Sequence, residues 1–188
     1  MRRLVERVVA LDFSLRSLLV LRRRMPKELQ KKTLLIQADV CTPPLARRFF
    51  TKAVSFQVFE HLPSATARRQ AASAVAELLA PGGSFTCTVY HWSKAKQRDA
   101  ARGVGDNTHK EGFHDSNIYY YNFEEPELRA MLHAAGMQVE WTKGLVIALR
   151  GSRLLGPLLL PMNRLLSSTR WGIRRSHLLL ARARPISQ

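Results

Sequence analysis

Residues 7–18 read RVVALDFSLRSL, and this stretch decides the fold class of the chain. Four apolar residues lead to Asp12, and Ser14 then precedes a new apolar pattern at helical spacing. The pattern predicts a buried strand that ends at Asp12, followed by a helix that Ser14 caps and that stops before Pro26. A carboxylate at the end of a strand is suited to a nucleotide ribose, because it accepts hydrogen bonds from both hydroxyls.

Beyond this stretch, strand-like runs alternate with helix-like runs, which is the order typical of an α/β sheet. Strands are predicted at 33–39, 53–58, 84–90, 137–142 and 176–185, and further helices at 65–80 and 124–135. The APGG segment at 80–83 is expected to end the first of these helices, because Pro and Gly cannot continue it. With 188 residues the chain is long enough for one such domain with a sizeable core, so we predict a single α/β domain over 1–188.

The chain is strongly basic, with 30 Lys and Arg against 14 Asp and Glu and a net charge of +16. Basic residues gather in RRR at 22–24 with the lysines that follow, and in the stretch from Trp141 to the end, which has nine basic residues and no acid. Nucleic acid, an anionic membrane surface and an acidic substrate all fit such an excess. We favour solvated helix faces, because the basic residues lie between apolar ones without aromatic stacking platforms, which argues against nucleic acid.

Cysteine usage and hydropathy bear on metal sites and on targeting. Cys41 and Cys87 fit no metal-ligand spacing and the His residues lack compact spacing, so we expect no metal site. We expect both cysteines to be free thiols. Free thiols are typical of a reducing cytosol, so a cytoplasmic protein is expected. The N-terminal apolar run is broken by Glu6 and Asp12, unlike that of a signal peptide, and no stretch has the ~18 consecutive apolar residues of a membrane-spanning helix.

Six segments, taken in order, resemble the class I S-adenosylmethionine-dependent methyltransferases of the small-molecule type. They are ALDFS (10–14), ADV (38–40), AVSFQVFEHLP (53–63), AELLAPGGSFTCTVY (76–90), FEEPELRAMLHAAGMQV (123–139) and HLLLARARP (177–185). Each is common by itself, but jointly they span most of the chain in the family's order. The resemblance implies a Rossmann-like methyltransferase sheet with helices on both faces and an antiparallel last strand, and S-adenosyl-L-methionine as the cofactor.

The resemblance also implies cofactor-binding roles for residues at the ends of predicted strands. Asp12 would hold the ribose hydroxyls, Phe13 would pack on the adenosine, and Asp39 would accept from the adenine amino group. The backbone of Val40 would contact an adenine ring nitrogen, and Gln57 would line the sulfonium end. Ligands do bind outside the carboxyl ends of strands in an open α/β sheet. The structural alternatives are a helix-capping Asp12, an Asp39 engaged in turn hydrogen bonds, and a core Phe13.

Methyl transfer is a direct displacement, so the protein must align the acceptor, the methyl group and the sulfur and must exclude water. A general base is needed only for a hydroxyl or a protonated amine, and His61 is the candidate because it follows a strand and a turn at the expected edge. Its alternative is a capping or packing histidine. A long loop is predicted at 91–122. The candidates there for an acceptor pocket or lid, or else for an ordinary exposed loop, are His91, Tyr119 and Tyr121, with His109, His114 and Tyr120.

The sequence departs from the family pattern at its start. The family's first strand and its glycine-rich loop, an acidic residue followed by Gly-x-Gly-x-Gly, should precede Asp12, and only MRRLVE precedes Arg7. We therefore expect an N-terminally truncated domain that lacks about one βα unit, on the order of 30 residues. A start at an internal Met, a decaying remnant gene and a partner chain that supplies the strand all fit. We expect this chain alone to bind S-adenosylmethionine weakly or not at all.

Two other function classes stay open beside the methyltransferase. One is a non-catalytic α/β interaction module, and the other is a basic domain on a membrane or on nucleic acid. The segment 144–166 is amphipathic enough to touch a bilayer interface or to cover a lipid-like acceptor. We predict a helical insertion at 150–168 that packs over the sheet or forms a lid. The acceptor atom, whether oxygen, nitrogen or carbon, and the oligomeric state stay open as well.

Overall fold

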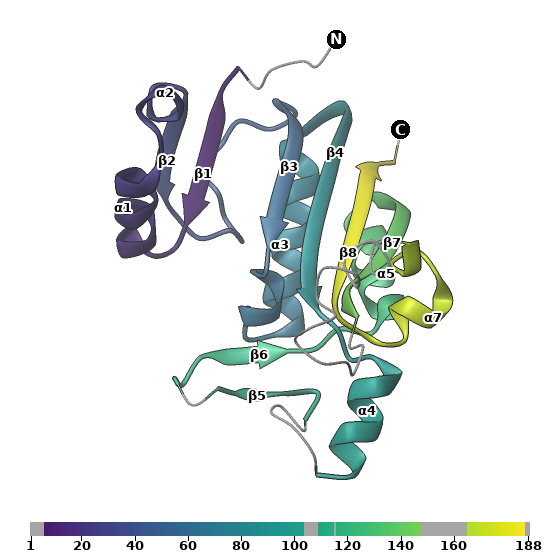
Figure 1. Cartoon of the computed structure of the whole chain (residues 1–188). Helices are drawn as coiled ribbons and strands as arrows, with labels where there is room; N and C mark the ends of the chain where they lie inside the picture. Colours follow the sequence, from purple (N-terminus) through teal and green to yellow (C-terminus); the bar gives the residue numbers. More distant parts are fainter. Residues whose placement is uncertain (1–5, 104–108, 115, 148–164, 187–188) are drawn as a thin grey trace. The chain divides into compact units, whose positions relative to one another are not determined.

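The structure is a computed structural model that describes residues 6–103, 109–114, 116–147 and 165–186 (Figure 1). The chain divides into two compact units, Met1–Leu45 and Ala46–Gln188, and each is described by itself. Both units combine strands with helices, so the predicted α/β class is confirmed.

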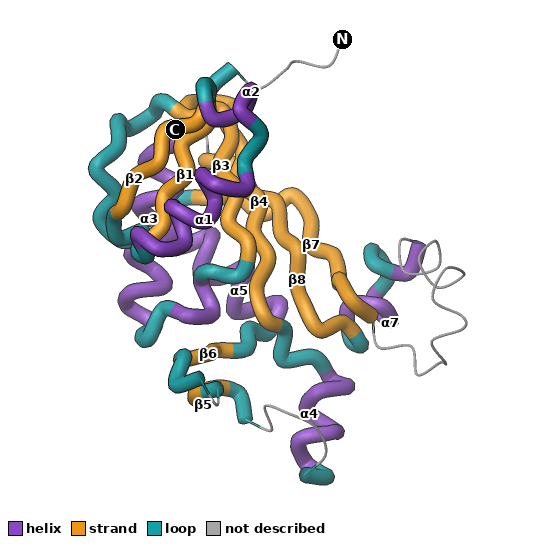
Figure 2. Tube along the Cα trace, turned by 60° about the vertical axis from the view of Figure 1, so that its left-hand side comes forward, coloured by secondary structure: helices purple, strands orange, loops and turns teal. Residues whose placement is uncertain are grey.

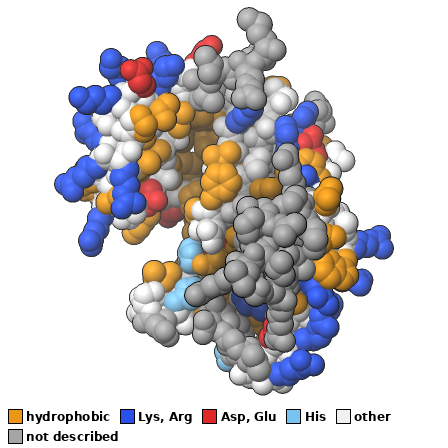
Figure 3. All heavy atoms as spheres, viewed as in Figure 1, with side chains coloured by type: hydrophobic (Ala, Val, Ile, Leu, Met, Phe, Trp, Pro, Cys, Tyr) orange, Lys and Arg blue, Asp and Glu red, His pale blue; other side chains and the backbone are white. Residues whose placement is uncertain are grey.

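The first unit is a strand–helix–strand arrangement built on the stretch at 7–18. Strands β1 (Val8–Asp12) and β2 (Thr33–Gln37) pair in parallel, and helices α1 (Leu15–Arg24) and α2 (Lys27–Gln30) connect them. The predicted cap is confirmed, because the Ser14 side chain accepts from the backbone N–H of Ser17. Helix α1 also ends before Pro26, as predicted. Figure 3 shows Lys and Arg side chains spread over α1 and α2.

The second unit contains a four-stranded sheet in the order β3-β4-β8-β7 (Figure 2). Strands β3 (Phe50–Phe56) and β4 (Leu79–Tyr90) run in parallel. Strand β8 (Ser176–Pro185) is antiparallel to both of its neighbours, β4 and β7 (Met137–Ile147). The antiparallel last strand implied by the resemblance is therefore confirmed, and the predicted bounds of 176–185 match β8 at both ends.

Helices α3 (Ala65–Leu78) and α5 (Glu125–Ala134) pack on this sheet, and the short turn η1 (Phe59–His61) leads from β3 to α3 (Figure 1). Ser64 caps α3 by accepting from the backbone N–H of Ala67, and a capping box of Glu124 and Glu127 starts α5. The core of the unit contains apolar side chains that are at most 1% exposed: Phe59, Ala71, Ala72, Phe85, Cys87, Val89, Leu128, Leu132, Met137, Leu179, Ala181 and Ala183. Burial of these apolar side chains holds the helices on the sheet.

The APGG segment at 80–83 differs from its prediction. Helix α3 ends just before it, as expected, but β4 then runs through all four residues. Gly82 has a φ of 74°, and a Cβ on Gly83 would lie 2.8 Å from the carbonyl oxygen of Ala80 and 3.1 Å from that of Phe50. The glycines therefore allow the start of β4 to approach β3 closely, which is a second reason for their presence besides stopping the helix.

The stretch at 91–122 contains more regular structure than the loop that its composition predicts. It forms helix α4 (Lys94–Ala101) and a hairpin of β5 (Glu111–Phe113) with β6 (Tyr119–Tyr121). A strand of three residues is too short to show a period, so sequence pattern alone misses it. The helical insertion predicted at 150–168 lies largely outside the described residues, and helix α7 (Arg170–Ile173) follows it.

Each unit has a strand edge without a partner among the described residues. Strand β1 pairs only with β2, and β3 pairs only with β4. On β3, Val54 is 66% exposed and Phe56 is 61% exposed. Unpaired backbone groups beside apolar side chains make such an edge a template for pairing with another strand.

Candidate active site

The carboxyl ends of β1 and β2 bring two predicted cofactor ligands to one edge of the first unit. The backbone N–H of Ala38 donates to the carbonyl oxygen of Asp12 at 3.2 Å, so Asp39 follows at the same edge. The Oδ1 atom of Asp12 accepts from the N–H of Ser14, and Oδ1 of Asp39 accepts from the N–H of Cys41, both at 2.8 Å. The turn hydrogen bonds of the structural alternative are therefore present. Each bond uses only one oxygen of its carboxylate, so a ligand can bind at the other.

The side chains beside these carboxylates are open to an adenosine. Phe13 is 80% exposed, so the alternative that places it in a core is wrong. The side-chain amide of Gln37 donates to the carbonyl oxygen of Phe13 at 3.2 Å and supports this turn, and Val40 is half-buried. Ribose hydroxyls and an adenine amino group donate to carboxylates, and an aromatic ring stacks on a base. The residues of this edge therefore fit the adenosine half of S-adenosylmethionine.

The remaining predicted residues belong to the second unit, where β3 ends. Gln57 has a φ of 55°, a left-handed conformation that is uncommon outside glycine, and its N–H donates to the carbonyl oxygen of Thr88 at 3.1 Å. The turn η1 follows and ends at His61, whose Nδ1 lies 2.8 Å from the carbonyl oxygen of Tyr119. A carbonyl oxygen only accepts, so Nδ1 carries the proton. In the neutral ring Nε2 is then the acceptor.

Four rings, including that of His61, lie together, and we call His61, Tyr90, His114 and Tyr120 the ring cluster. The ring centroid of His61 lies 5.7 Å from that of Tyr90 and 6.4 Å from that of His114. His114 lies 6.1 Å from Tyr90 and 4.7 Å from Tyr120. The rings come from η1, from the end of β4 and from the β5–β6 hairpin. Within the described ranges, Nε2 of His61 has no hydrogen-bond partner, so the cluster contains an available base.

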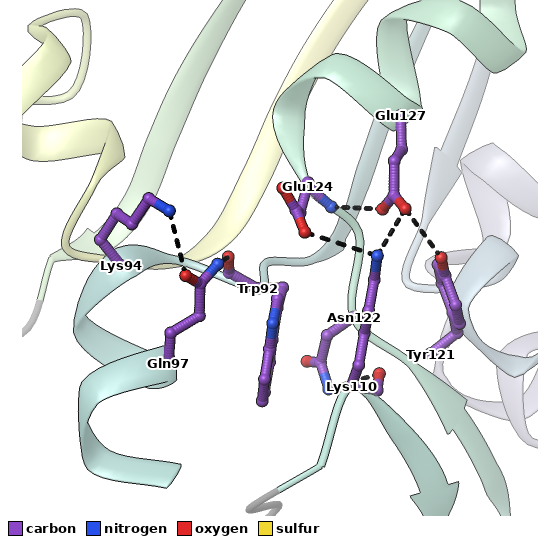
Figure 4. A network of polar contacts seen from close by, with 8 residues as sticks. All are labelled: Trp92, Lys94, Gln97, Lys110, Tyr121, Asn122, Glu124 and Glu127. Atoms are coloured by element: carbon purple, nitrogen blue, oxygen red, sulfur yellow. Dashed lines mark hydrogen bonds and ion pairs between the residues drawn. The ribbon is translucent and has the colours of Figure 1, made fainter. Parts of the chain in front are cut away.

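The predicted acceptor residues on β6 are held by polar side chains. The hydroxyl of Tyr119 donates to Oε2 of Glu111 at 2.7 Å, and the hydroxyl of Tyr121 donates to Oε1 of Glu127 at 3.2 Å. Figure 4 shows the Glu127 carboxylate between Tyr121 and the Lys110 ammonium group, with which it forms an ion pair. These contacts tie the β5–β6 hairpin to the first turn of α5.

His91, the third predicted acceptor residue, lies in a separate buried network. It is 5% exposed, and its Nδ1 lies 2.9 Å from the hydroxyl of Ser176, which donates to the carbonyl oxygen of Ile173. Burial lowers the pKa of His91 to about 4, so the ring is neutral at physiological pH. The structure thus brings His61 and Tyr119 together. It records no side-chain contact of His91 with the ring cluster in the part of the chain it describes.

Sequence reasoning missed Glu60, the residue before His61. Its side chain is fully buried, and neither carboxylate oxygen has a hydrogen-bond partner among the described residues. Burial raises the pKa of Glu60 to about 7, although the backbone amides of Glu60 and Tyr90 act in the opposite direction. The only sequence signal is a single acid between apolar residues in VFEHLP (58–63).

The described ranges offer neither a metal site nor a membrane-spanning helix. No group of three or more His, Cys, Asp or Glu residues in these ranges could hold a metal ion. No helix among the same residues has both the length and the apolar character needed to cross a bilayer.

Comparison with known proteins gives one family match and many structural ones. Residues 1–87 match a family model described as a methyltransferase domain. No curated protein matches the chain in sequence. A structural match comes from the complex between the Haloferax volcanii Trm112 methyltransferase activator and a methyltransferase. It is 16% identical, has a TM-score of 0.65, and covers 98% of this chain and 73% of that one.

Two further structures illustrate the range of the matches. An S-adenosylmethionine-dependent methyltransferase from Mesorhizobium loti is 19% identical with a TM-score of 0.65, over 96% of this chain and 81% of that one. The Burkholderia thailandensis 1,6-didemethyltoxoflavin-N1-methyltransferase, solved with 1,6-didemethyltoxoflavin and S-adenosylhomocysteine, is 18% identical with a TM-score of 0.58. The match covers 96% of this chain but 62% of that enzyme, so the chain spans less than two thirds of its length.

At these identities the structural matches establish the fold, and the family match adds a sequence pattern over residues 1–87. The resemblance inferred from the six segments is thereby confirmed. The chain therefore has the fold of the S-adenosylmethionine-dependent methyltransferases, and its residues 1–87 match a methyltransferase domain in sequence.

Proposed function

We propose that this chain is a methyltransferase domain that acts on a small-molecule acceptor. The observation that carries the proposal is the ring cluster, in which His61 keeps Nε2 available at the carboxyl end of β3. The toxoflavin-type enzyme among the structural matches, solved with a small heterocycle, supports a small acceptor. A glycopeptide N-methyltransferase also matches, so larger acceptors are the competing class.

The first unit would hold the adenosine half of the cofactor. Asp12 and Asp39 would accept from the ribose hydroxyls and the adenine amino group through the carboxylate oxygens that the turn bonds leave open. Phe13 would stack on the base, and the Val40 backbone would contact a ring nitrogen. By the resemblance alone, Gln57 at the carboxyl end of β3 would line the sulfonium end. When bound, the cofactor supplies a methyl group on a sulfur that is a good leaving group.

In the second unit, His61 would accept a proton at Nε2 from an acceptor hydroxyl or ammonium group. The Nδ1–H bond to the Tyr119 carbonyl would stabilise the imidazolium that forms. Tyr119 and Tyr121 would form a wall of the acceptor pocket, because their hydroxyls are held by Glu111 and Glu127 and their rings are fixed. His91 would contribute indirectly, because its ring fixes the start of β8 through Ser176.

A second candidate function, an interaction module, rests on the unpaired edge of β3. Val54 and Phe56 are exposed there, next to backbone groups with no partner among the described residues. One structural match comes from a complex with an activator protein, so a protein partner is compatible with this fold. A segment that added a strand to β3 would satisfy these groups.

Calorimetric titration with S-adenosylmethionine tests the cofactor site. Asp12→Asn keeps Oδ1 for the Ser14 N–H and removes only the charge. Loss of charge-assisted hydrogen bonds is expected to weaken binding by about 10–100-fold, from about 1.5–3 kcal/mol. Asp99→Asn, on α4, is the matched control and should bind like the wild type. Weak binding by the wild type is expected, and equal affinities of wild type and Asp12→Asn would contradict the assignment.

Production of S-adenosylhomocysteine with a panel of small hydroxyl and amine acceptors tests the base. His61→Asn keeps a donor for the Tyr119 carbonyl and removes Nε2. We expect about 100-fold slower transfer to a hydroxyl acceptor with unchanged cofactor affinity. A His61→Asn rate equal to that of the wild type would exclude His61 as the base.

A further inference from the structure

We infer that Arg68 is the positioning residue of His61: its guanidinium fixes η1 against β6 and so holds His61 in the tautomer with the proton on Nδ1. The part of this inference that concerns catalysis rests on the proposed function, whereas the part that concerns the tautomer does not. Arg68 lies on the first turn of α3, four residues after the Ser64 cap, and sequence pattern gives it no role.

Arg68 is buried, with 6% of its surface exposed, and it contacts two segments at once. One guanidinium nitrogen donates to the carbonyl oxygen of Leu62 at 2.9 Å and lies 3.4 Å from the hydroxyl of Tyr119. The guanidinium carbon lies 3.9 Å from the ring centroid of Tyr121 and 5.8 Å from that of Phe123. One side chain therefore joins the residue after His61 to both ends of β6.

These contacts differ from those of an arginine in an ordinary ion pair. No carboxylate in the described ranges lies within ion-pair distance of Arg68. Arg68 is linked to an acid only through the Tyr119 hydroxyl, which donates to Oε2 of Glu111 at 2.7 Å, within the described residues. A planar guanidinium that stacks on a ring and donates in its own plane fixes its neighbours in orientation as well as in distance. A lysine has the charge but neither the plane nor the fork, so it cannot reproduce this geometry.

The two segments that Arg68 joins are those that meet at the His61 ring. Leu62 follows His61 directly, and the carbonyl oxygen of Tyr119 is the acceptor of the Nδ1–H bond at 2.8 Å. If η1 and β6 separate, this hydrogen bond lengthens and the preference for a proton on Nδ1 is lost. Nε2 then carries the proton in part of the molecules, and those molecules have no base facing an acceptor.

The test compares Arg68→Lys and Arg68→Met with the control Arg69→Met. Arg69 is exposed, and its one side-chain hydrogen bond within the described residues goes to the hydroxyl of Thr66, at 3.5 Å. Nitrogen-15 NMR of the His61 ring reports which nitrogen carries the proton, and tryptophan fluorescence reports folding. In wild type and in Arg69→Met we expect one tautomer, protonated at Nδ1. In Arg68→Lys and Arg68→Met we expect both tautomers, with kcat for a hydroxyl acceptor about 10–100-fold lower and cofactor affinity unchanged.

Should the Arg68 variants fail to fold, Tyr119→Phe serves as the second variant, because it removes the hydroxyl beside Arg68 and keeps the carbonyl that His61 contacts. A mixture of His61 tautomers is again expected. A single Nδ1-protonated tautomer in every folded variant would overturn the inference. Mixed tautomers together with an undiminished kcat would support the positioning role and refute His61 as the base, so the two failures are distinguishable.

Discussion

Two buried residues of the second unit, Glu60 and His91, should make opposing contributions to the pH dependence of stability. Burial raises the pKa of Glu60 from 4.5 to about 7, so between these values the folded state binds the proton more tightly and stability falls as pH rises. Burial lowers the pKa of His91 from 6.5 to about 4, so the unfolded state binds the proton more tightly and stability rises with pH. Each full effect is worth about 3 kcal/mol, because a tenfold change in proton affinity corresponds to about 1.4 kcal/mol.

Because the two pH windows overlap, the wild-type free energy of unfolding should differ little between pH 5 and pH 7.5. Glu60→Gln removes one slope, and its stability should rise by about 2 kcal/mol over this interval. His91→Asn keeps a donor for the Ser176 hydroxyl and should lose about 2 kcal/mol over the same interval. The double variant should again be nearly flat. His177, whose pKa burial also lowers, adds a slope of the same sign as His91, but it is common to all four proteins.

Urea denaturation followed by tryptophan fluorescence measures these differences, since Trp92, Trp141 and Trp171 all lie in the second unit. Glu77→Gln, which changes a side chain that is 52% exposed, is the control and should follow the wild type. The acids Glu125 and Glu127 have lowered pKa values and lose their stabilising effect at acidic pH, so the interval starts above their range. Parallel pH profiles of wild type and Glu60→Gln would refute the reasoning.

Three further changes test local features of the fold. Gly83→Ala should destabilise the second unit by about 1–3 kcal/mol, because its Cβ would meet backbone oxygens. Gly82→Ala meets no neighbouring atom and has only a positive φ, so it should cost about 1 kcal/mol. A larger loss for Gly82→Ala than for Gly83→Ala in urea denaturation would contradict this. Ser64→Ala should lower the free energy of unfolding by about 1 kcal/mol, because it removes the cap of α3. Ser64→Asp keeps an acceptor and should retain this stability. Equal losses of stability in thermal unfolding of the two variants would exclude the cap. We expect the exposed β3 edge to pair between copies at high concentration. Phe56→Lys should then reduce self-association in sedimentation velocity, whereas Phe56→Leu should not, and equal sedimentation of the two variants would count against that edge.

Much of the fold could be predicted from local sequence, because its elements have clear periods and clear ends. The strand at 176–185 is an alternating run, and its inward residues Leu179, Ala181 and Ala183 are buried as such a run requires. Ser14 was identifiable as a cap because it stands between a strand and a helical pattern. The β5–β6 hairpin was not, because its strands of three residues are held by contacts with distant residues such as Arg68 and Glu127.

The site divides in a similar way. Strand ends could be located from sequence, and with them Asp12, Asp39 and His61. The sequence could not show that two histidines have different surroundings. His61 keeps one ring nitrogen available, whereas His91 is buried and hydrogen-bonded to Ser176. The burial of Glu60 and the stacking of Arg68 on Tyr121 likewise depend on how η1, α3 and β6 pack, which no local pattern encodes.

The position of β8 in the sheet has a consequence for how the second unit folds. Strand β7 pairs only with β8 among the described strands, and β8 lies between β7 and β4. Of these four strands, β8 is the last that the ribosome makes, so β7 has no partner in the sheet until β8 has left the exit tunnel. Since β8 pairs with β4 across about 90 residues of chain, its docking is a long-range step that we expect to limit the folding rate. Until then, the edge of β4 that faces away from β3 is also unpaired, and the nascent chain needs protection from association.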